Sequence, residues 1–139
     1  MSKQYATFWL GDGLYGIEVE RVREVLRQQD ITRVPLAPTT VAGLLNLRGQ
    51  VVTTIDLRER LQLEPNEGEQ EPMLVVVLVA GESIALLVDR IGGVVDVDDE
   101  QFEPPPDTLI GNVRELVRGA YKLEAQLLLG LDVDAAVAA

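Results

Sequence analysis

The sequence contains no cysteine and no histidine among its 139 residues. Without cysteine, the chain has neither disulfide bonds nor a thiolate metal site. Without histidine, it lacks the commonest general base, the commonest metal ligand and any phosphohistidine relay. Its two serines, Ser2 and Ser83, do not lie in a G-x-S-x-G motif. We therefore predict no catalytic residue, no cofactor and no enzymatic activity.

Long hydrophobic segments are also missing. The longest apolar run, MLVVVLVAG at 73–81, is too short to span a bilayer. The first ten residues lack the apolar region and cleavage site of a signal peptide. We expect a cytoplasmic protein with no direct membrane insertion. The net charge of −11 argues against binding to nucleic acid or to an anionic membrane, because both require basic surfaces.

The charge is unevenly distributed along the chain. Residues 21–60 hold seven arginines and four acidic residues, a local balance of +3, so the remaining residues sum to −14. Such an arginine-rich strip is consistent with a docking face for an acidic protein partner, and equally with ordinary solvated surface.

Short β-branched runs bounded by glycine, proline or aspartate predict a mainly β protein. The expected strands are 4–10, 14–19, 51–57, 73–80, 83–88, 93–97 and 127–131. A helix is predicted over 18–27, with Val22, Val25 and Leu26 on one face. Shorter helical turns are predicted at 56–61, capped by Asp56, and at 111–117. Segments 64–72 and 98–107 have the proline and acidic residues of exposed loops.

Two parts of the chain repeat each other. Residues 8–26 match residues 77–95 without a gap at an offset of 69, and Leu47-Arg48-Gly49 matches Val117-Arg118-Gly119. The pattern predicts one β-rich unit present twice. The repeat also bears on the motif Gly11-x-Gly13-x-x-Gly16, which has the spacing of a phosphate-binding loop. A dinucleotide-binding loop needs a helix after its third glycine, but here a strand is predicted there, and none of the three glycines is present in the second copy of the repeat. We therefore predict a hairpin at this motif.

Two other kinds of site are less well supported. The acidic run at 96–100 offers oxygen ligands for Ca²⁺ or Mg²⁺, but it lacks the glycine and distal glutamate of an EF-hand loop. A solvated strand end is the favoured interpretation, and no metal site is predicted. A small-ligand-binding β-barrel that uses a cleft between two barrels is a further alternative. The few aromatic residues and the absence of a convergent polar cluster in the sequence argue against it.

The segment with the most candidate functional residues is GLLNLRGQVVTTIDLRERL at 43–61. Arg48 followed by Gly49 places a guanidinium at the entrance to a β-branched strand, where it can pair with a carboxylate of a partner or of its own chain. A structural role is equally consistent, because Gly49 permits a positive φ and Asp56 caps the next helix.

The motif N-L-R-G-x-V-V-x-x-I-D-L-R-x-R-L at 46–61 resembles the signature of the CheW family of chemotaxis coupling proteins. The resemblance extends through 15–25, 31–38 and 41–49, and downstream through 85–95 and 127–137. One departure is Thr53, where many relatives have proline; we expect it to alter a strand edge.

The resemblance implies a fold of two five-stranded SH3-like β-barrel subdomains sharing a core, with short helices. The whole chain, 1–139, is then one CheW-like domain. Its first subdomain is expected at roughly 14–70 and its second at roughly 83–130, with the terminal strands crossing between them.

The resemblance also implies a non-catalytic adaptor between the regulatory domain of the histidine kinase CheA and the cytoplasmic tips of methyl-accepting chemotaxis receptors. An equivalent coupling protein of a motility or development pathway is the alternative. The partner-binding residues are expected to be Arg48, its neighbour Glu24, Asn46, Gly49, and the apolar Val22, Ile91 and Val94. The alternative for these three apolar residues is burial in the core.

Overall fold

The computed structural model describes residues 2–27, 30–64 and 71–138. Its strands are β1 (Ser2–Leu10), β2 (Gly13–Glu18), β3 (Val22–Arg27), β4 (Ile31–Thr32), β5 (Val41–Leu47), β6 (Gln50–Asp56), β7 (Met73–Val79), β8 (Glu82–Val88), β9 (Arg90–Asp98), β10 (Phe102–Glu103), β11 (Val117–Lys122) and β12 (Leu127–Leu131). Its helices are α1 (Leu57–Arg60), α2 (Gly111–Leu116), α3 (Val133–Val137) and the 3₁₀ turns η1 (Val19–Arg21) and η2 (Asp99–Gln101). None of these helices is long and apolar enough to cross a membrane.

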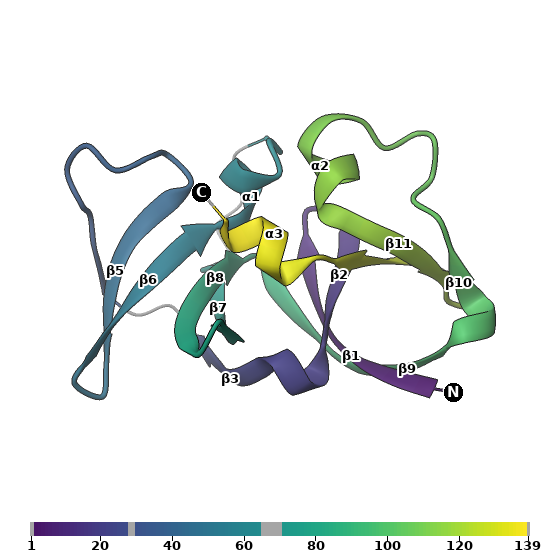
Figure 1. Ribbon diagram of the computed structural model, residues 1–139, viewed down its shortest axis with the longest axis horizontal. Helices are drawn as coiled ribbons and strands as arrows, with labels where there is room; N and C mark the ends of the chain where they lie inside the picture. The colour runs from purple at the N-terminus through teal and green to yellow at the C-terminus, as the bar shows by residue number, and fades with distance from the viewer. Residues whose placement is uncertain (1, 28–29, 65–70, 139) are drawn as a thin grey trace.

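The strands form two sheets that lie side by side in Figure 1. The first sheet has the order β10-β11-β12-β2-β1-β9, and the second has the order β3-β7-β8-β6-β5-β4. Within the described residues, each sheet has five longer strands and one two-residue strand, β10 or β4. The expectation of a mainly β fold built from two SH3-like units is confirmed.

The two halves of the chain exchange their first hairpins. The β1–β2 hairpin pairs with β9 and β12 of the second half, whereas the β7–β8 hairpin pairs with β3 and β6 of the first half. The two hairpins share one register at the predicted offset of 69, because Leu10 faces Gly13 and Val79 faces Glu82. In each sheet the central contact is parallel, β2 with β12 and β8 with β6. The predicted repeat and the predicted hairpin at Gly11 are therefore confirmed.

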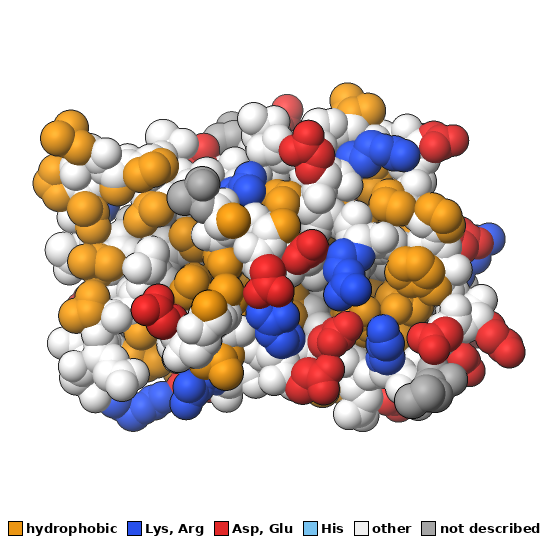
Figure 2. Space-filling model, in the orientation of Figure 1, with side chains coloured by type: hydrophobic (Ala, Val, Ile, Leu, Met, Phe, Trp, Pro, Cys, Tyr) orange, Lys and Arg blue, Asp and Glu red, His pale blue; other side chains and the backbone are white. Residues whose placement is uncertain are grey.

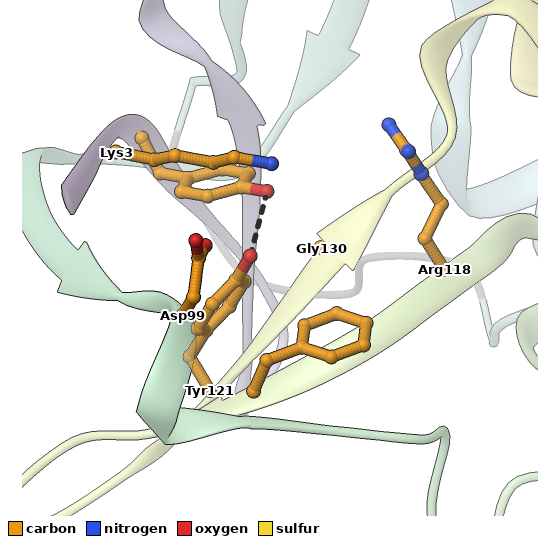
Figure 3. Close-up of a pocket in the computed structure, with 7 residues that line it drawn as sticks. Lys3, Asp99, Arg118, Tyr121 and Gly130 are labelled. Atoms are coloured by element: carbon orange, nitrogen blue, oxygen red, sulfur yellow. Dashed lines mark hydrogen bonds between the residues drawn. The ribbon is translucent and has the colours of Figure 1, made fainter. Parts of the chain in front are cut away.

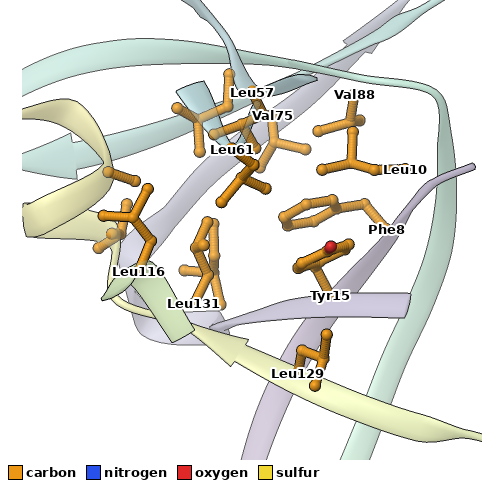
Figure 4. Packing of buried hydrophobic residues seen from close by; sticks show 14 of the residues in the cluster. Phe8, Leu10, Tyr15, Leu57, Leu61, Val75, Val88, Leu116, Leu129 and Leu131 are labelled. Atoms are coloured by element: carbon orange, nitrogen blue, oxygen red, sulfur yellow. The ribbon is translucent and has the colours of Figure 1, made fainter. Parts of the chain in front are cut away.

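Three clusters of buried side chains follow from this arrangement. The largest joins both sheets: Phe8 and Tyr15 of the first sheet pack in one cluster with Leu57, Val75 and α3 (Figure 4). A smaller cluster around Tyr121 lies within the first sheet, and another around Leu74 lies within the second. The core is therefore shared between the sheets, and each sheet also has an apolar interior of its own.

The helix predicted over 18–27 is wrong. Only the 3₁₀ turn η1 is helical; Glu18 ends β2, and the residues after η1 form β3, paired with β7. The side chains of β3 alternate between half-buried and exposed positions, as in a strand. A ten-residue helix is marginal by itself, and valine favours strands, so pairing with a distant strand decides the conformation.

Other local predictions have mixed outcomes. Both short helices are confirmed as α1 and α2, and Asp56 caps α1 by accepting hydrogen bonds from the backbone of Arg58 and Glu59. Strands β5 and β11 and helix α3 were not predicted. Segment 98–107 contains η2 and β10, and residues 65–70 of the other expected loop lie outside the described residues.

We expected Thr53 to alter a strand edge. The structure places it inside the sheet instead, because β6 pairs with β5 on one side and with β8 on the other. The expected boundaries of the two subdomains, 14–70 and 83–130, stay a prediction.

Two buried threonines allow a test of how the core treats hydroxyl groups. Thr7 Oγ1 donates a hydrogen bond of 2.7 Å to the Gly93 carbonyl, whereas Thr54 Oγ1 is buried without a partner among the described residues. We expect Thr54→Val to raise the free energy of unfolding by about 1 kcal/mol, because it removes an unsatisfied buried hydroxyl. Thr7→Val should lower it by about 1 kcal/mol. Urea denaturation measures both, and a destabilised Thr54→Val protein would contradict the prediction.

Candidate functional site

Arg48 lies at the tip of the β5–β6 hairpin. The last strand pair is Leu47 with Gln50, so Arg48 and Gly49 form a two-residue turn. Their φ angles are 50° and 85°, and two positive values are typical of a type I′ hairpin turn. Asn46 Oδ1 accepts a hydrogen bond of 3.0 Å from the backbone N–H of Gly49. Asn46 and Gly49 therefore hold the turn, and the Arg48 side chain extends from it with 68% of its surface exposed.

Glu24 fixes the direction of the Arg48 side chain. Arg48 Nη1 donates to Glu24 Oε1 at 3.1 Å, and Nη2 donates to Oε2, so the contact is bidentate. Glu24 lies on β3 at one edge of the second sheet, while the β5–β6 hairpin belongs to its other end. The hydrogen bonds from Arg48 lower the pKa of the Glu24 carboxyl below its usual value. The pair that the family resemblance implied is present in the structure.

The three apolar candidates divide between the two sheets. Val22 lies on β3, is half-buried and packs against the shared core. Ile91 and Val94 lie on β9 of the first sheet, with 36% and 58% of their surfaces exposed. Val22 faces Val77 and Ile91 faces Phe8, which is the same pairing at an offset of 69. Figure 1 shows β3 and β9 along the same lower side of the molecule. Of the three, only Val22 has a clear place in the core.

A buried ion pair connects α1 with the junction of β8 and β9. Arg58 Nε donates to Asp89 Oδ1 at 2.9 Å, and Nη2 donates to Oδ2. The Arg58 and Asp89 side chains are only 17% and 10% exposed. The backbone N–H of Gly11 also donates to Asp89 Oδ2, at 2.7 Å. The Asp89 carboxylate therefore connects the β1–β2 turn of the first sheet with α1, the helix that follows β6 of the second sheet.

The environment of Asp89 sets its protonation. Burial acts to raise the pKa of this carboxyl, but hydrogen bonds from Arg58 and Gly11 outweigh burial, so the net shift is downward. The sequence did not predict the Arg58–Asp89 pair. The only signal was indirect: Asp89 falls on Glu20 in the repeat, and Arg58 lies in the helix capped by Asp56.

A second ion pair lies at the corresponding crossing between the sheets, in the other half of the chain. Arg21 of η1, between β2 and β3, donates to Asp134 of α3 at 2.6 Å and to the Leu78 carbonyl at 3.1 Å. The Asp134 side chain is 64% exposed. Helix α3, like α1, is capped by an aspartate, since Asp132 accepts from the Ala135 N–H at 3.2 Å.

Several arginines of the arginine-rich strip bind groups of the same chain. Arg21, Arg48 and Arg58 pair with carboxylates of the same chain, and Arg60 donates to the backbone carbonyls of Ala135 and Ala136 in α3. Of these four, Arg48 combines a position at a hairpin tip with high exposure. Within the part of the chain that the structure describes, no group of three or more acidic residues is placed to hold a metal ion.

Comparisons with known proteins agree with one another. A family model described as a CheW-like domain matches residues 4–139. Chemotaxis protein CheW of Treponema pallidum is 32% identical over 134 residues, 94% of this chain and 79% of the relative. Chemotaxis protein CheW of Bacillus subtilis is 30% identical over 121 residues, 87% of this chain and 78% of the relative. The crystal structure of scaffolding protein TtCheW from Thermoanaerobacter tengcongensis superimposes with a TM-score of 0.84 at 30% identity, covering 94% of this chain and 89% of that one.

The buried ion pair generates a stability prediction. Asp89→Asn keeps the shape of the side chain but removes its charge, so we expect the free energy of unfolding at pH 7 to fall by about 2 kcal/mol. Because the pKa of Asp89 is lowered in the folded protein, its contribution is present above the unfolded-state pKa of about 3.9 and is lost as the pH falls through the folded value. The difference between wild type and variant should therefore shrink below about pH 4.

Asp134→Asn is the matched control, since it neutralises the exposed member of the equivalent pair. It should cost a small fraction of the Asp89→Asn effect, because exposed ion pairs contribute little. Urea titrations of both variants between pH 3 and pH 7 measure the difference. Equal losses in the two variants at pH 7 would contradict the assignment of Asp89 as the stronger link.

Proposed function

This chain belongs to the CheW family, and on that premise we propose that it is a non-catalytic scaffold that couples chemotaxis receptors to the histidine kinase CheA. Support comes from a family match over nearly the whole chain and from the similarity to a scaffolding protein over 94% of it. The expected partners are the regulatory domain of CheA and the cytoplasmic tips of methyl-accepting receptors. The protein would then act in the cytoplasm, recruited to receptor arrays at the inner face of the membrane.

The observation that carries the proposal is the geometry of Arg48. Its side chain is exposed at a hairpin tip, yet both ends of its guanidinium are held by Glu24. A side chain that is ordered before binding loses less conformational entropy in a complex. The remaining N–H groups of the planar guanidinium stay available to a carboxylate or carbonyl of a partner.

The apolar candidates extend the proposed contact surface. Ile91 and Val94 are exposed on β9, and the half-buried Val22 lies on β3, two residues before Glu24. Exposed apolar side chains on a rigid sheet are suitable anchors for an amphipathic helix, which is how a receptor hairpin would present itself. We assign Asn46 and Gly49 a supporting role, because they maintain the turn from which Arg48 extends.

The turn geometry gives a direct test of Arg48. A positive φ is unfavourable for arginine and readily adopted by glycine, so Arg48→Gly should leave the unfolding midpoint unchanged or raise it. The same substitution removes the guanidinium, and we expect affinity for one partner to weaken about tenfold or more. Isothermal titration calorimetry against the CheA regulatory domain and against a receptor signalling fragment measures the change, and circular dichroism measures folding.

Ala80→Gly is the matched control. Ala80 and Gly81 have φ angles of 50° and 82° in the β7–β8 turn, close to those of Arg48 and Gly49. Ala80→Gly should give the same relief of the backbone with no loss of binding. Loss of affinity in both variants would show that turn flexibility, not the guanidinium, is responsible. A wild-type protein that binds neither partner would contradict the chemotaxis assignment and favour a receptor–kinase pathway of another kind.

A further inference from the structure

A cavity opens at one end of the first sheet, away from the Arg48 turn. Its volume is about 330 Å³, within the range of small-molecule sites. Lys3 and Tyr5 come from β1, Asp99 and Phe102 from η2 and β10, and Arg118 and Tyr121 from β11 (Figure 3). Four separate elements thus bring aromatic and charged side chains to one place.

Three aromatic rings form one wall of the cavity. The centroid of Tyr121 lies 5.2 Å from that of Tyr5 and 5.2 Å from that of Phe102, with interplanar angles of 51° and 63°. Tyr5 and Tyr121 are buried, whereas Phe102 is exposed at the rim. Mutual packing fixes the two tyrosines, so their hydroxyl groups have defined positions.

The two hydroxyl groups leave one donor unused. Tyr5 Oη and Tyr121 Oη lie 3.3 Å apart and share one hydrogen bond, for which either can be the donor. A pair of hydroxyls has two protons, and neither oxygen makes another hydrogen bond within residues 2–27, 30–64 and 71–138. Burial raises the pKa of Tyr5 strongly, so this group remains protonated at neutral pH. The second proton is therefore available to an acceptor in the cavity.

Two cations line the same cavity. The Lys3 ammonium and the Arg118 guanidinium both approach Glu18 Oε1, at 3.9 Å and 3.8 Å. These distances are too long for hydrogen bonds, so one carboxylate only partly compensates two positive charges. Asp99 lies on another side of the same cavity. A ligand with one negative charge directed toward Lys3 and Arg118 fits this distribution better than a multiply charged anion.

We propose that this cavity binds a small organic monocarboxylate with an aromatic or apolar body. The carboxylate accepts hydrogen bonds from the free tyrosine O–H and from N–H groups of Lys3 and Arg118, and the body packs against Phe102 at the rim. This site is separate from the proposed scaffold function and does not depend on it.

Benzoate and benzamide are suitable probes, because they share a shape and differ in charge. We expect benzoate to shift the amide resonances of the strands around Tyr5 and Tyr121 in a ¹⁵N correlation spectrum of the full chain, with a Kd of about 1 mM. Benzamide should bind at least about tenfold more weakly. Absence of saturable shifts at about 20 mM benzoate, equal binding of the two probes, or shifts located elsewhere would each overturn the proposal.

Variants identify the groups responsible. The double variant Lys3→Gln/Arg118→Gln should abolish the preference for benzoate over benzamide, whereas Lys122→Gln, which removes an exposed lysine outside the cavity, should retain it. Gly130→Ala tests whether the ligand occupies the cavity, because it adds a methyl group to the cavity wall. A Cβ at this position would lie 3.8 Å from Tyr5 Oη, an ordinary contact, so the fold should tolerate a methyl group that occupies the ligand's space. Unchanged benzoate binding in both the double variant and Gly130→Ala would contradict the assignment.

Discussion

The exchange of hairpins between the two halves of the chain is the constraint on which the rest of the structure depends. Neither half can form a complete sheet, because each sheet contains strands from both halves. β2 is a central strand of the first sheet, whereas β3, which follows η1, is an edge strand of the second. The chain crosses between the sheets at η1 and again at Asp89. The shared core includes side chains from both sheets. Relative motion of the sheets would therefore disrupt the burial of these side chains.

Each crossing is held by an ion pair to the short helix at the end of a neighbouring strand, with the charges reversed. At one crossing, Asp89 accepts from Arg58 of α1; at the other, Arg21 donates to Asp134 of α3. The duplicated architecture thus repeats a link between each crossing and a short helix, but the linking residue is displaced by one position, because Asp89 falls on Glu20 and Arg21 falls on Arg90. The two links are unequal, because the first is buried and also binds Gly11, whereas the second is exposed. The junction next to β9 is consequently the more strongly fixed of the two.

Local chemistry predicted the features that depend on neighbouring residues. Glycine at the β1–β2 turn, aspartate before α1 and the repeat itself were all recognised in the sequence and are present in the fold. The prediction of a helix over 18–27 was wrong because the apolar spacing of this segment fits a helix and an edge strand equally well. Pairing with β7, some fifty residues away, selects the strand. The Arg48–Glu24 pair was expected from family resemblance, not from the residues alone. The Arg58–Asp89 pair and the tyrosine cavity were not predicted, since both join segments that only the exchanged topology brings together.

The β5–β6 and β7–β8 turns have the same backbone conformation and differ in their first residue. Both have two residues with positive φ, and both end in glycine. In the β7–β8 turn the first position is Ala80, whereas in the β5–β6 turn it is Arg48, a residue that gains nothing from this backbone conformation. Its contact with Glu24 is exposed, so the pair adds little to stability. Neither backbone preference nor folding energy therefore accounts for arginine at this position, and an ordered guanidinium at the surface is the property that remains to explain it.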